Sequence, residues 1–415
     1  MNILYLCHRF PFPPKRGGKI RPFNMIRHLH GLHDVTVASL VRSTAEADEA
    51  GGIADFCSRY EMTRVADSLQ RLRMVARLPS TIPSSFGYFH SPALQRAVRR
   101  LLRERSFDLI FVHCSSVARY VERIDHIPKI LDFGDMDSQK WMDYAHFKRF
   151  PMNLGYRLEG MKLVAEEKRL ARAFDVCTAT TRAELETLDS HRTGAVSDWF
   201  PNGVDSEYFA PHNDAYDPDT LCFIGRMDYY PNQECMSDFC RTVFPLIRDR
   251  RPAAKLLIVG ADPPPSMRKL EEVPGVTVTG SVADVRPYLR RSAAMVAPLH
   301  IARGTQNKIL EAMASGVPVV TSTAAAGGVD AVAGMHFQVA DTASDIAAAT
   351  LALMCDPAAR RRFAAAGRAR MLSHHDWSGS MRRLDGIIQR CLEIRSERYP
   401  SDRARAAGAL TRLAN

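Results

Sequence analysis

The chain has 415 residues, enough for two domains that each bury a core of their own. Hydrophobic residues make up 46% of the chain and charged residues 25%, and no apolar run approaches the ~20 residues of a membrane span. The formal net charge of +10 favours an anionic partner. Nucleic acid is not expected as that partner, because no helix-turn-helix, zinc-finger or aromatic RNA-binding pattern is present.

The N-terminus and the cysteines indicate a reducing compartment. The opening residues, MNILYLC, predict a buried strand and not a secretory signal, since no long apolar stretch with a small-residue cleavage site is present. The nine cysteines contain no Cys-x-x-Cys pair, which favours free thiols over a disulfide framework or a zinc site. We therefore expect a cytoplasmic protein.

Short apolar segments alternate with helix-period segments, a pattern typical of parallel βαβ architecture. In the first half the expected helices are Arg21–Leu29 and Gly160–Ala173, and the expected strands are Asn2–Cys7, Asp34–Leu40, Leu109–His113, Lys129–Phe133 and Val176–Thr180. In the second half the expected strands are Leu221–Ile224, Lys255–Val259, Val276–Thr279, Ala294–Ala297 and Val317–Thr321. Between the halves, Pro211–Thr220 is polar and turn-rich and is expected to be a linker.

These elements predict an α/β fold of two doubly wound, Rossmann-like domains that face each other across a cleft. Residues 1–205 would form the N-terminal domain and residues 206–378 the C-terminal domain. A C-terminal helix is expected over 379–396, followed by a weakly ordered tail over 397–415.

The segment Leu94–Arg105 has helical periodicity. Its apolar and basic positions fall on opposite sides, at Leu94, Val98 and Leu101 and at Arg96, Arg99, Arg100 and Arg103. A solvated helix face is one interpretation, and a face that rests on an acidic bilayer is the other. The second interpretation makes an anionic membrane surface an expected partner.

The stretch Pro298–Val320, PLHIARGTQNKILEAMASGVPVV, carries the strongest signal for a site. A glycine loop leads into a helix expected over Gln306–Ala314, which ends at Gly316 before the next strand. The first N–H groups of such a helix have no partner within it, and together with the helix dipole they form an anion site.

Three side chains of this stretch add to that site. Arg303 and Lys308 place two cations around the loop, and Glu311, one turn further on, is placed to accept hydrogen bonds from hydroxyls. Diphosphate at the helix tip with ribose at the carboxylate is the arrangement that a sugar nucleotide requires. A plain loop–helix–strand packing unit is the alternative.

Five blocks of the sequence together resemble a known family. They are HRFPFPPKRGGKIRPFNMIRHL near the N-terminus, LDFGDMDSQKW, PNGVDSEYF at 201–209, FIGRMDYYPN at 223–232 and the stretch quoted above. The chain resembles GT-B glycosyltransferases of the family 4 type. More closely, it is similar to the sugar transferases associated with the PEP-CTERM/exosortase system of exopolysaccharide-producing bacteria.

The resemblance assigns residues to a nucleotide-sugar donor. The glycine loop at Gly17 and Gly18 would lie over the donor phosphates and sugar, although a plain βα turn is the alternative. Arg226, at the end of its strand, would contact the diphosphate, with a surface arginine as the alternative. The loop Gly280–Asp284 would take the nucleobase at Val282, and Asp284 is a plausible N-cap. The full set of expected donor-binding residues is Gly17, Gly18, Arg226, Val282, Arg303, Gly304, Thr305, Lys308 and Glu311.

On the acceptor side, Asp135 and Asp137 are the candidate catalytic carboxylates, with Glu311 the third catalytic candidate through its hold on the donor. An Asp-x-Asp pair binds metal in a different transferase fold, but the resemblance implies a metal-independent reaction with no cofactor. The alternative is that one aspartate caps a helix that begins near Ser138. His113 is a weaker candidate, since a packed core histidine fits equally well. The turn Asn202–Asp205 is expected to shape the hinge.

Two departures from the family put donor-sugar selectivity in doubt. The first of two glutamates spaced eight positions apart would fall at Arg303, so the charge there is reversed. The lysine expected after the Gly-Arg strand end is missing, and Pro231 and Asn232 occupy that region. Lys308 is a candidate to supply the missing charge.

The sequence therefore predicts a cytoplasmic glycosyltransferase of hexosyltransferase type, with peripheral attachment to the inner face of the plasma membrane. It would move a sugar from a nucleoside diphosphate sugar to a lipid-linked or glycan acceptor in exopolysaccharide biosynthesis, with retention implied by the resemblance. One alternative is a non-catalytic sugar-nucleotide-binding or scaffold subunit. A nicotinamide-dependent oxidoreductase is a more distant rival, because no Gly-x-Gly-x-x-Gly follows the first strand.

Overall fold

The computed structural model describes residues 1–14, 17–212 and 215–399. The chain divides into two compact units. Unit 1 comprises Met1–Phe200 and the chain from Met381 onward, and unit 2 comprises Pro201–Ser380. The chain thus first passes from unit 1 to unit 2 after Phe200. The sequence analysis had put this boundary after residue 205.

Unit 1 is built on a seven-stranded sheet in the order β3-β2-β1-β4-β5-β6-β7, and every neighbouring pair of strands is parallel. The strands are β1 (Asn2–Cys7), β2 (Asp34–Val41), β3 (Arg59–Arg64), β4 (Leu109–His113), β5 (Lys129–Gly134), β6 (Val176–Ala179) and β7 (Val196–Trp199). Strand order reverses between β1 and β4, and open α/β sheets bind ligands at the carboxyl ends of strands beside such a switch point.

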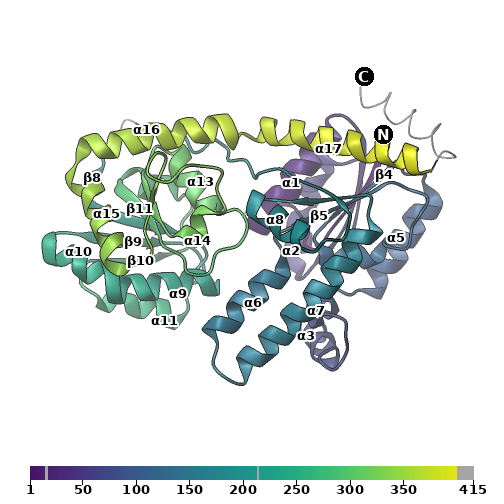
Figure 1. Ribbon diagram of the computed structural model, residues 1–415, viewed down its shortest axis with the longest axis horizontal. Helices are drawn as coiled ribbons and strands as arrows, with labels where there is room; N and C mark the ends of the chain where they lie inside the picture. The colour runs from purple at the N-terminus through teal and green to yellow at the C-terminus, as the bar shows by residue number, and fades with distance from the viewer. Residues whose placement is uncertain (15–16, 213–214, 400–415) are drawn as a thin grey trace. The chain divides into compact units, whose positions relative to one another are not determined.

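The helices of unit 1 connect these parallel strands (Figure 1). They are α1 (Gly17–His30), α2 (Thr44–Ala50), α3 (Asp67–Ala76), α4 (Ser84–Tyr88), α5 (Pro92–Glu104), α6 (Asp137–Phe147), α7 (Met152–Ala173) and α8 (Arg182–Ser190). Crossovers between parallel strands are right-handed, so a reversal of strand order places helices on both faces of the sheet. Gly17 and Gly18 are the first two residues of α1, which corrects the prediction that they form a loop ahead of a helix at Arg21.

Unit 2 repeats this plan with a six-stranded parallel sheet in the order β10-β9-β8-β11-β12-β13. Its strands are β8 (Asp217–Ile224), β9 (Lys255–Val259), β10 (Val276–Gly280), β11 (Ser292–Ala297), β12 (Val319–Thr321) and β13 (Gln338–Val339). Its helices are α9 (Tyr230–Asp238), α10 (Phe244–Arg250), α11 (Pro265–Arg268), α12 (Arg286–Arg290), α13 (Asn307–Ala314), α14 (Thr323–Ala326), α15 (Ala343–Cys355) and α16 (Pro357–His374). Because β8 begins at Asp217, the end of the predicted linker Pro211–Thr220 is strand and not linker.

The last described helix, α17 (Trp377–Arg398), follows the predicted C-terminal helix and joins unit 1 from Met381 onward. Its apolar side is buried, with Leu384, Ile388 and Leu392 fully inaccessible. Asp385 accepts a hydrogen bond from His28 Nε2 of α1 at 2.8 Å, and α17 lies near α1 in Figure 1. Of the predicted weakly ordered tail, residues 400–415 lie outside the described residues.

The chain segments that pass between the units are fastened to one another inside unit 2. Val204 pairs with Asp376, and the Val204 N–H donates to the His375 carbonyl at 2.8 Å. A side chain at Gly203 would collide with Trp377. The turn Asn202–Asp205 therefore has a structural role in holding the two crossings side by side.

Candidate functional site

Helix α13 lies between β11 and β12 in the chain, next to the switch point of the unit 2 sheet. It ends as predicted, since Gly316 adopts a left-handed φ of +69° and the N–H groups of Gly316 and Val317 donate to the carbonyls of Met313 and Ala312. At its N-terminus, Gln306 makes no side-chain cap hydrogen bond, and the first turn contains no acidic residue. The first N–H groups of α13 are thus left for an anion.

The loop before α13 is held by a close backbone contact. A Cβ at Gly328 would overlap the carbonyl oxygen of Gly304, so only glycine allows these two segments to touch. Beside Gly304, the Thr305 hydroxyl is buried and has no hydrogen-bond partner within the described residues. A buried hydroxyl without a partner is costly, which marks this loop as a place where a polar ligand would bind.

Asn232, for which the sequence analysis predicted no role, holds Lys308 at the end of β8. The Lys308 ammonium donates to Asn232 Oδ1 at 2.8 Å, and Asn232 Nδ2 donates to the Arg226 carbonyl at 2.8 Å. Asn232 is buried, with 3% of its surface exposed. It therefore fixes Lys308 beside the Gly225–Arg226 strand end. A lysine from another element thus reaches the strand end at which the resemblance led us to expect one.

Burial brings the pKa values of Lys308 and Glu311 close to neutrality. It lowers the pKa of Lys308 to about 8, against the opposing effects of Cys235 and Glu311. It raises the pKa of Glu311 to about 7, and the Lys308 charge partly offsets that rise. The Glu311 carboxylate accepts no hydrogen bond within the described residues, so its oxygens are available to ligand hydroxyls. Titratable groups with such shifts are typical of functional sites.

Arg226 is half-buried and already paired. Its guanidinium donates to both oxygens of Asp228, at 2.9 and 2.6 Å, and to Asp262 Oδ2 at 2.6 Å. A diphosphate at Arg226 would have to compete with these two carboxylates. They hold the guanidinium at the carboxyl end of the sheet, in line with the predicted position, but they also reduce the net charge that it offers.

The loop after β10 lies where it was predicted, but the helix that follows it begins later than the prediction had it. Helix α12 begins at Arg286, and Val285, not Asp284, is its N-cap residue. Asp284 still accepts the Arg286 N–H at 2.9 Å and pairs with the Arg286 side chain. The Val282 side chain is half-buried and packs against the core of unit 2, so the backbone of this loop stays the part that we expect to serve a nucleobase.

In unit 1 a buried charged network lies at the carboxyl ends of β4 and β5. Asp132 accepts hydrogen bonds from Arg21 Nε at 2.9 Å, Arg21 Nη2 at 3.1 Å and the Thr178 hydroxyl at 2.9 Å, and its Oδ2 lies 2.7 Å from His113 Nδ1. Burial alone would raise the pKa of Asp132, but Arg21 and His113 hold it well below its usual value. A carboxylate at Nδ1 orients the imidazole so that Nε2 is left for another group.

Our sequence analysis identified little of this network, since it named only His113, and that as a weaker candidate. Asp132 falls inside the predicted apolar strand Lys129–Phe133, and a carboxylate in a buried strand requires a partner. That signal could have identified Asp132. The partners could not be identified in the same way, because Arg21 lies on α1 and His113 ends β4.

Asp135 and Asp137 follow β5 directly, and neither caps α6 with its side chain. Helix α6 begins at Asp137, and the N–H groups of Met136 and Ser138 donate to Glu184 at 2.6 Å and to Glu167 at 2.9 Å. This excludes the alternative in which an aspartate of the pair is the helix cap.

The two aspartates differ in environment. Asp135 accepts a hydrogen bond from the Thr180 hydroxyl at 3.1 Å. Burial raises the pKa of Asp137 to about 6, with Lys140 opposing the rise and Glu167 and Asp135 adding to it. Of the pair, Asp137 is thus the carboxyl poised to exchange a proton near neutral pH.

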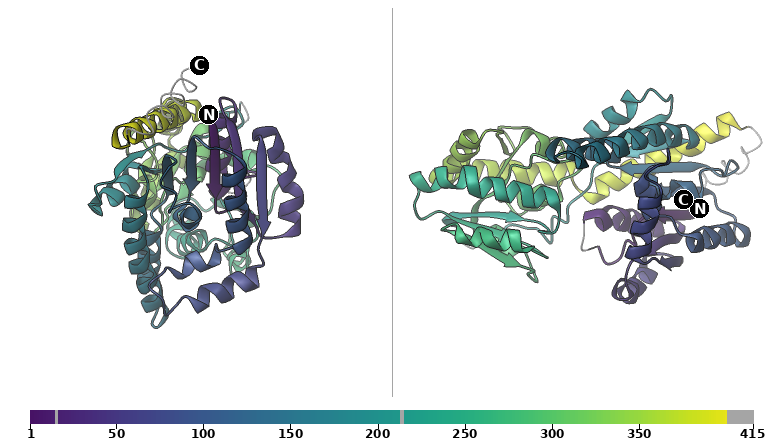
Figure 2. Two further views of the ribbon diagram at one scale, coloured as in Figure 1. Left: turned by 90° about the vertical axis from the view of Figure 1, so that its right-hand side faces the viewer. Right: turned by 90° about the horizontal axis from the view of Figure 1, so that it is seen from below.

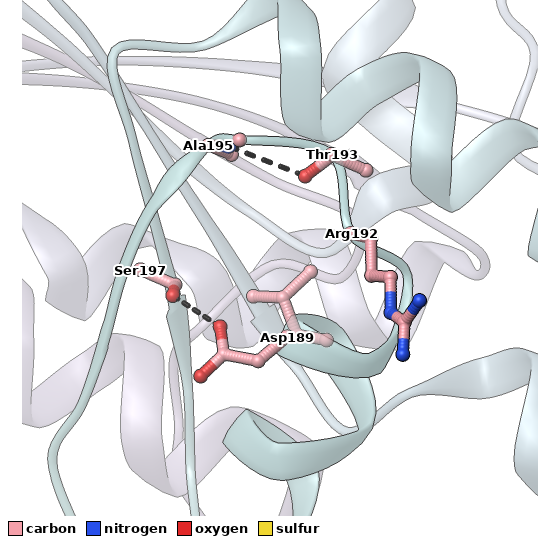
Figure 3. Close-up of a pocket in the computed structure, with 7 residues that line it drawn as sticks. Asp189, Arg192, Thr193, Ala195 and Ser197 are labelled. Atoms are coloured by element: carbon pink, nitrogen blue, oxygen red, sulfur yellow. Dashed lines mark hydrogen bonds between the residues drawn. The ribbon is translucent and has the colours of Figure 1, made fainter.

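A small hollow in unit 1 lies apart from these groups. Figure 3 shows it between the end of α8 and the start of β7, with Asp189, Arg192 and Ser197 among its lining residues. The Ala195 N–H donates to the Thr193 hydroxyl at 3.3 Å, and the Ser197 hydroxyl donates to Asp189. It lies at the amino end of β7, the edge of the sheet opposite to the carboxyl ends, and it contains no predicted site residue.

Residues 218–356 match the family described as "Glycosyl transferases group 1", a segment that runs from β8 to the end of α15 and includes Arg226, Asn232, Lys308 and Glu311. No curated protein sequence matches the chain.

Several solved structures are similar to the whole chain. Sucrose-phosphate synthase from Thermosynechococcus elongatus is 15% identical with a TM-score of 0.69, over 94% of this chain and 99% of that one. HepE from Anabaena, in complex with UDP and glucose, is 14% identical with a TM-score of 0.66 over the same shares. Trehalose 6-phosphate synthase from Burkholderia multivorans is 13% identical with a TM-score of 0.63, over 96% of this chain and 100% of that one. At these identities the likeness shows the fold, which is the predicted GT-B arrangement of two Rossmann-like sheets.

Proposed function

We propose that this protein is a glycosyltransferase that moves a sugar from a nucleoside diphosphate sugar to a lipid-linked or glycan acceptor. The observation that carries the proposal is the uncapped N-terminus of α13, with Lys308 held over the end of β8 by Asn232 and Glu311 one turn further along. These residues all fall inside the segment that matches the family of group 1 glycosyl transferases. The arrangement provides cations for a diphosphate and a carboxylate for hydroxyls.

The donor is proposed to be a uridine diphosphate sugar. Anabaena HepE was solved with UDP-glucose, and a TarM variant from S. aureus was solved with UDP, which supports this choice of base. In this chain the α13 N-terminus, Lys308 and Arg303 would bind the diphosphate, and Glu311 would accept hydrogen bonds from the ribose. The backbone around Val282 would receive the base.

Charge on the departing diphosphate would be stabilised by Arg226, Lys308 and the α13 N–H groups, the electrostatic route to rate acceleration. Lys308 and the α13 N-terminus would then take the place of a divalent ion at the diphosphate. The reaction is therefore proposed to be metal-independent, and the resemblance to family 4 transferases supports retention of configuration.

On the acceptor side, Asp137 is the proposed carboxyl for proton exchange, and His113, oriented by Asp132, is a second polar group at the same sheet edge. The acceptor is proposed to be lipid-linked or glycan in nature and to belong to exopolysaccharide assembly, as the resemblance to the PEP-CTERM/exosortase-associated transferases implies. A lipid-linked acceptor would bring a cytoplasmic protein to the inner face of the plasma membrane.

The test is a thermal-shift screen of nucleotides and sugar nucleotides, followed by transfer and donor hydrolysis assays. Because a ligand that binds the native state stabilises it, UDP and UDP-sugars should raise the melting temperature while NAD should not. A shift with UDP-sugars but no transfer or hydrolysis with any acceptor would favour the non-catalytic binding subunit. A shift with NAD alone would refute the proposal.

A further inference from the structure

Unit 1 exposes two groups of large apolar side chains on neighbouring helices. The α6–α7 hairpin exposes Phe147, Phe150, Met152, Leu154 and Leu158 toward its tip and Met161 further along α7, and Phe150 is 79% exposed. Helix α3 and the residues after it expose Leu69, Leu72, Val75 and Leu78, with Leu72 at 64%. Single exposed apolar residues are ordinary, but so many on neighbouring elements mark an interaction surface. We call these two groups together the hairpin patch.

The α6–α7 hairpin is a firm support for this patch. Trp141 and Tyr156 have ring centroids 5.1 Å apart, and Gly160 lets α7 approach the Met142 side chain of α6. Figures 1 and 2 show the pair projecting from unit 1. The tip residues beyond this contact remain exposed to solvent.

The two parts of the patch are fastened to each other. Lys162 of α7 donates to the Leu78 carbonyl at 2.8 Å, just beyond α3. Glu159 of α7 accepts the N–H groups of Ser84 and Ser85 at the start of α4, at 2.9 and 2.8 Å. Helix α4 in turn packs on α3, since a side chain at Gly87 would collide with the Arg73 carbonyl. The apolar residues of α3 and of the hairpin therefore belong to one connected surface.

The exposed charges interspersed with the patch are mostly positive, and Glu159, between Leu158 and Met161, is buried and accepts hydrogen bonds from Ser84 and Ser85. The sequence from Ala145 to Leu158 contains two arginines, Arg149 and Arg157, and one lysine but no acidic residue. The sequence from Ser68 to Ser80 contains three arginines and no acidic residue. Apolar and aromatic residues mixed with cations are the combination that binds an interface of acyl chains and acidic headgroups. A purely protein partner would not require this one-sided charge.

We propose that the hairpin patch is the surface by which this protein binds an anionic lipid bilayer. The basic helix α5, which the sequence favoured for that role, offers less. Its apolar residues Leu94, Val98 and Leu101 are buried in the core of unit 1, and Arg100 is paired with Glu61 at 2.8 Å. Helix α5 can thus add charge but has no apolar side chain to insert, whereas the hairpin patch has both.

The patch is joined directly to the candidate acceptor side. Helix α6 starts at Asp137, at the end of β5, and its 11 residues carry the chain to the patch at Phe147. At 1.5 Å per residue this separates Asp137 from Phe147 by about 15 Å along the helix axis. A membrane-bound hairpin would hold the carboxyl end of the sheet near a lipid-linked acceptor. This link rests on the proposed function, whereas bilayer binding itself does not.

Co-sedimentation with two kinds of vesicle tests the proposal, one of phosphatidylcholine alone and one of phosphatidylcholine mixed with phosphatidylglycerol. We expect the full chain to bind the mixed vesicles, and added salt to weaken that binding. The variant Leu72→Ser/Phe150→Ser/Leu154→Ser should lower the partition coefficient by roughly tenfold or more. Arg149→Glu/Arg157→Glu should do the same on mixed vesicles only.

The matched control is Leu246→Ser/Leu372→Ser, which removes two exposed leucines from unit 2 and should leave vesicle binding unchanged. All variants should keep the thermal shift with UDP-sugar, because none touches the donor residues. The two hypotheses can therefore fail separately. If the wild type shows no thermal shift with UDP-sugar, the proposed function is refuted, but the vesicle result is unaffected.

Three outcomes would overturn the inference. Equal binding of the wild type to both kinds of vesicle would remove the role of charge. The membrane surface would instead be α5 if the hairpin variants bound vesicles as the wild type does and the variant Arg96→Gln/Arg99→Gln/Arg103→Gln lost that binding. A concentration-dependent dimer that the hairpin variants dissolve, with no vesicle binding, would make the patch an interface between two copies of the chain.

Discussion

Replacement of Asn232 by leucine should make donor binding depend on pH in a new way. Asn232 accepts the hydrogen bond from the Lys308 ammonium at 2.8 Å, the one hydrogen bond that the described residues give this group. Leucine has a similar size but no acceptor. The charged form of Lys308 then loses its partner while it remains buried, and the uncharged form gains relative stability.

The size of the effect follows from the loss of a charge-assisted hydrogen bond. Such a bond contributes about 1.5–3 kcal/mol, and one pKa unit corresponds to about 1.4 kcal/mol. The pKa of Lys308, already lowered by burial to about 8, should therefore fall by roughly one to two further units. Near neutral pH most of the variant would lack the cation proposed to bind the diphosphate. In the wild type the cation is present below about 8 and is lost above it.

The assay is calorimetric titration with a UDP-sugar from about pH 6 to about pH 9. A UDP-sugar is preferable to UDP, because a terminal phosphate itself titrates with a pKa near ~6. The ratio of wild-type to variant affinity should lie within about twofold of unity at the acidic end, where the wild-type lysine is charged and at least about half of the variant lysine is charged. It should rise near neutral pH to about twofold for a pKa lowered by one unit, and to about tenfold for a pKa lowered by two units.

Gln233 provides the matched control. Its Nε2 donates to the Met227 carbonyl at 2.8 Å, much as Asn232 Nδ2 donates to the Arg226 carbonyl, but Gln233 has no hydrogen bond to Lys308. Gln233→Leu should therefore lose loop anchoring without any change in the pH profile. If Asn232→Leu and Gln233→Leu give the same profile, or if the wild-type affinity is flat through pH 8, the reasoning about Lys308 is refuted.

Four further predictions concern the donor residues and the aspartate pair. Glu311→Ala should lose about 1.5–3 kcal/mol of donor binding with the fold intact, measured by calorimetry and far-UV circular dichroism, and unchanged affinity would make Glu311 a structural residue. In the wild type, donor affinity should also fall below a pH of about 7 as Glu311 becomes protonated, which Glu311→Gln should abolish. Turnover should persist in EDTA; abolition with rescue by manganese would make Asp135 and Asp137 metal ligands. Arg303→Glu should weaken donor binding and slow transfer while acceptor affinity changes little, and wild-type donor affinity in that variant would exclude a phosphate role.

The sequence alone determined the central strands and the stop of α13. Most of the predicted strands lie inside their sheet, where apolar runs are continuous, and the edge strand β10 was predicted as well. The strands that it did not predict, β3, β7 and β13, lie at sheet edges and are only partly buried, so their sequences carry a weaker pattern. Gly316 ended α13 as predicted, since left-handed backbone at a helix end is a local property of the residue.

Only the tertiary structure decided which polar groups meet. Asn232 and Lys308 are 76 positions apart, and Arg21 and Asp132 are 111 positions apart, so their contacts depend on strand order and not on spacing. The capping of α6 by Glu167 and Glu184 likewise excluded a role that local sequence had left open for Asp135 and Asp137. Exposure follows the same rule: Leu101 and Leu72 both occupy apolar positions of arginine-rich helices, but one faces the core and the other faces solvent. Periodicity records that a helix has an apolar face, whereas the rest of the fold decides whether anything covers it.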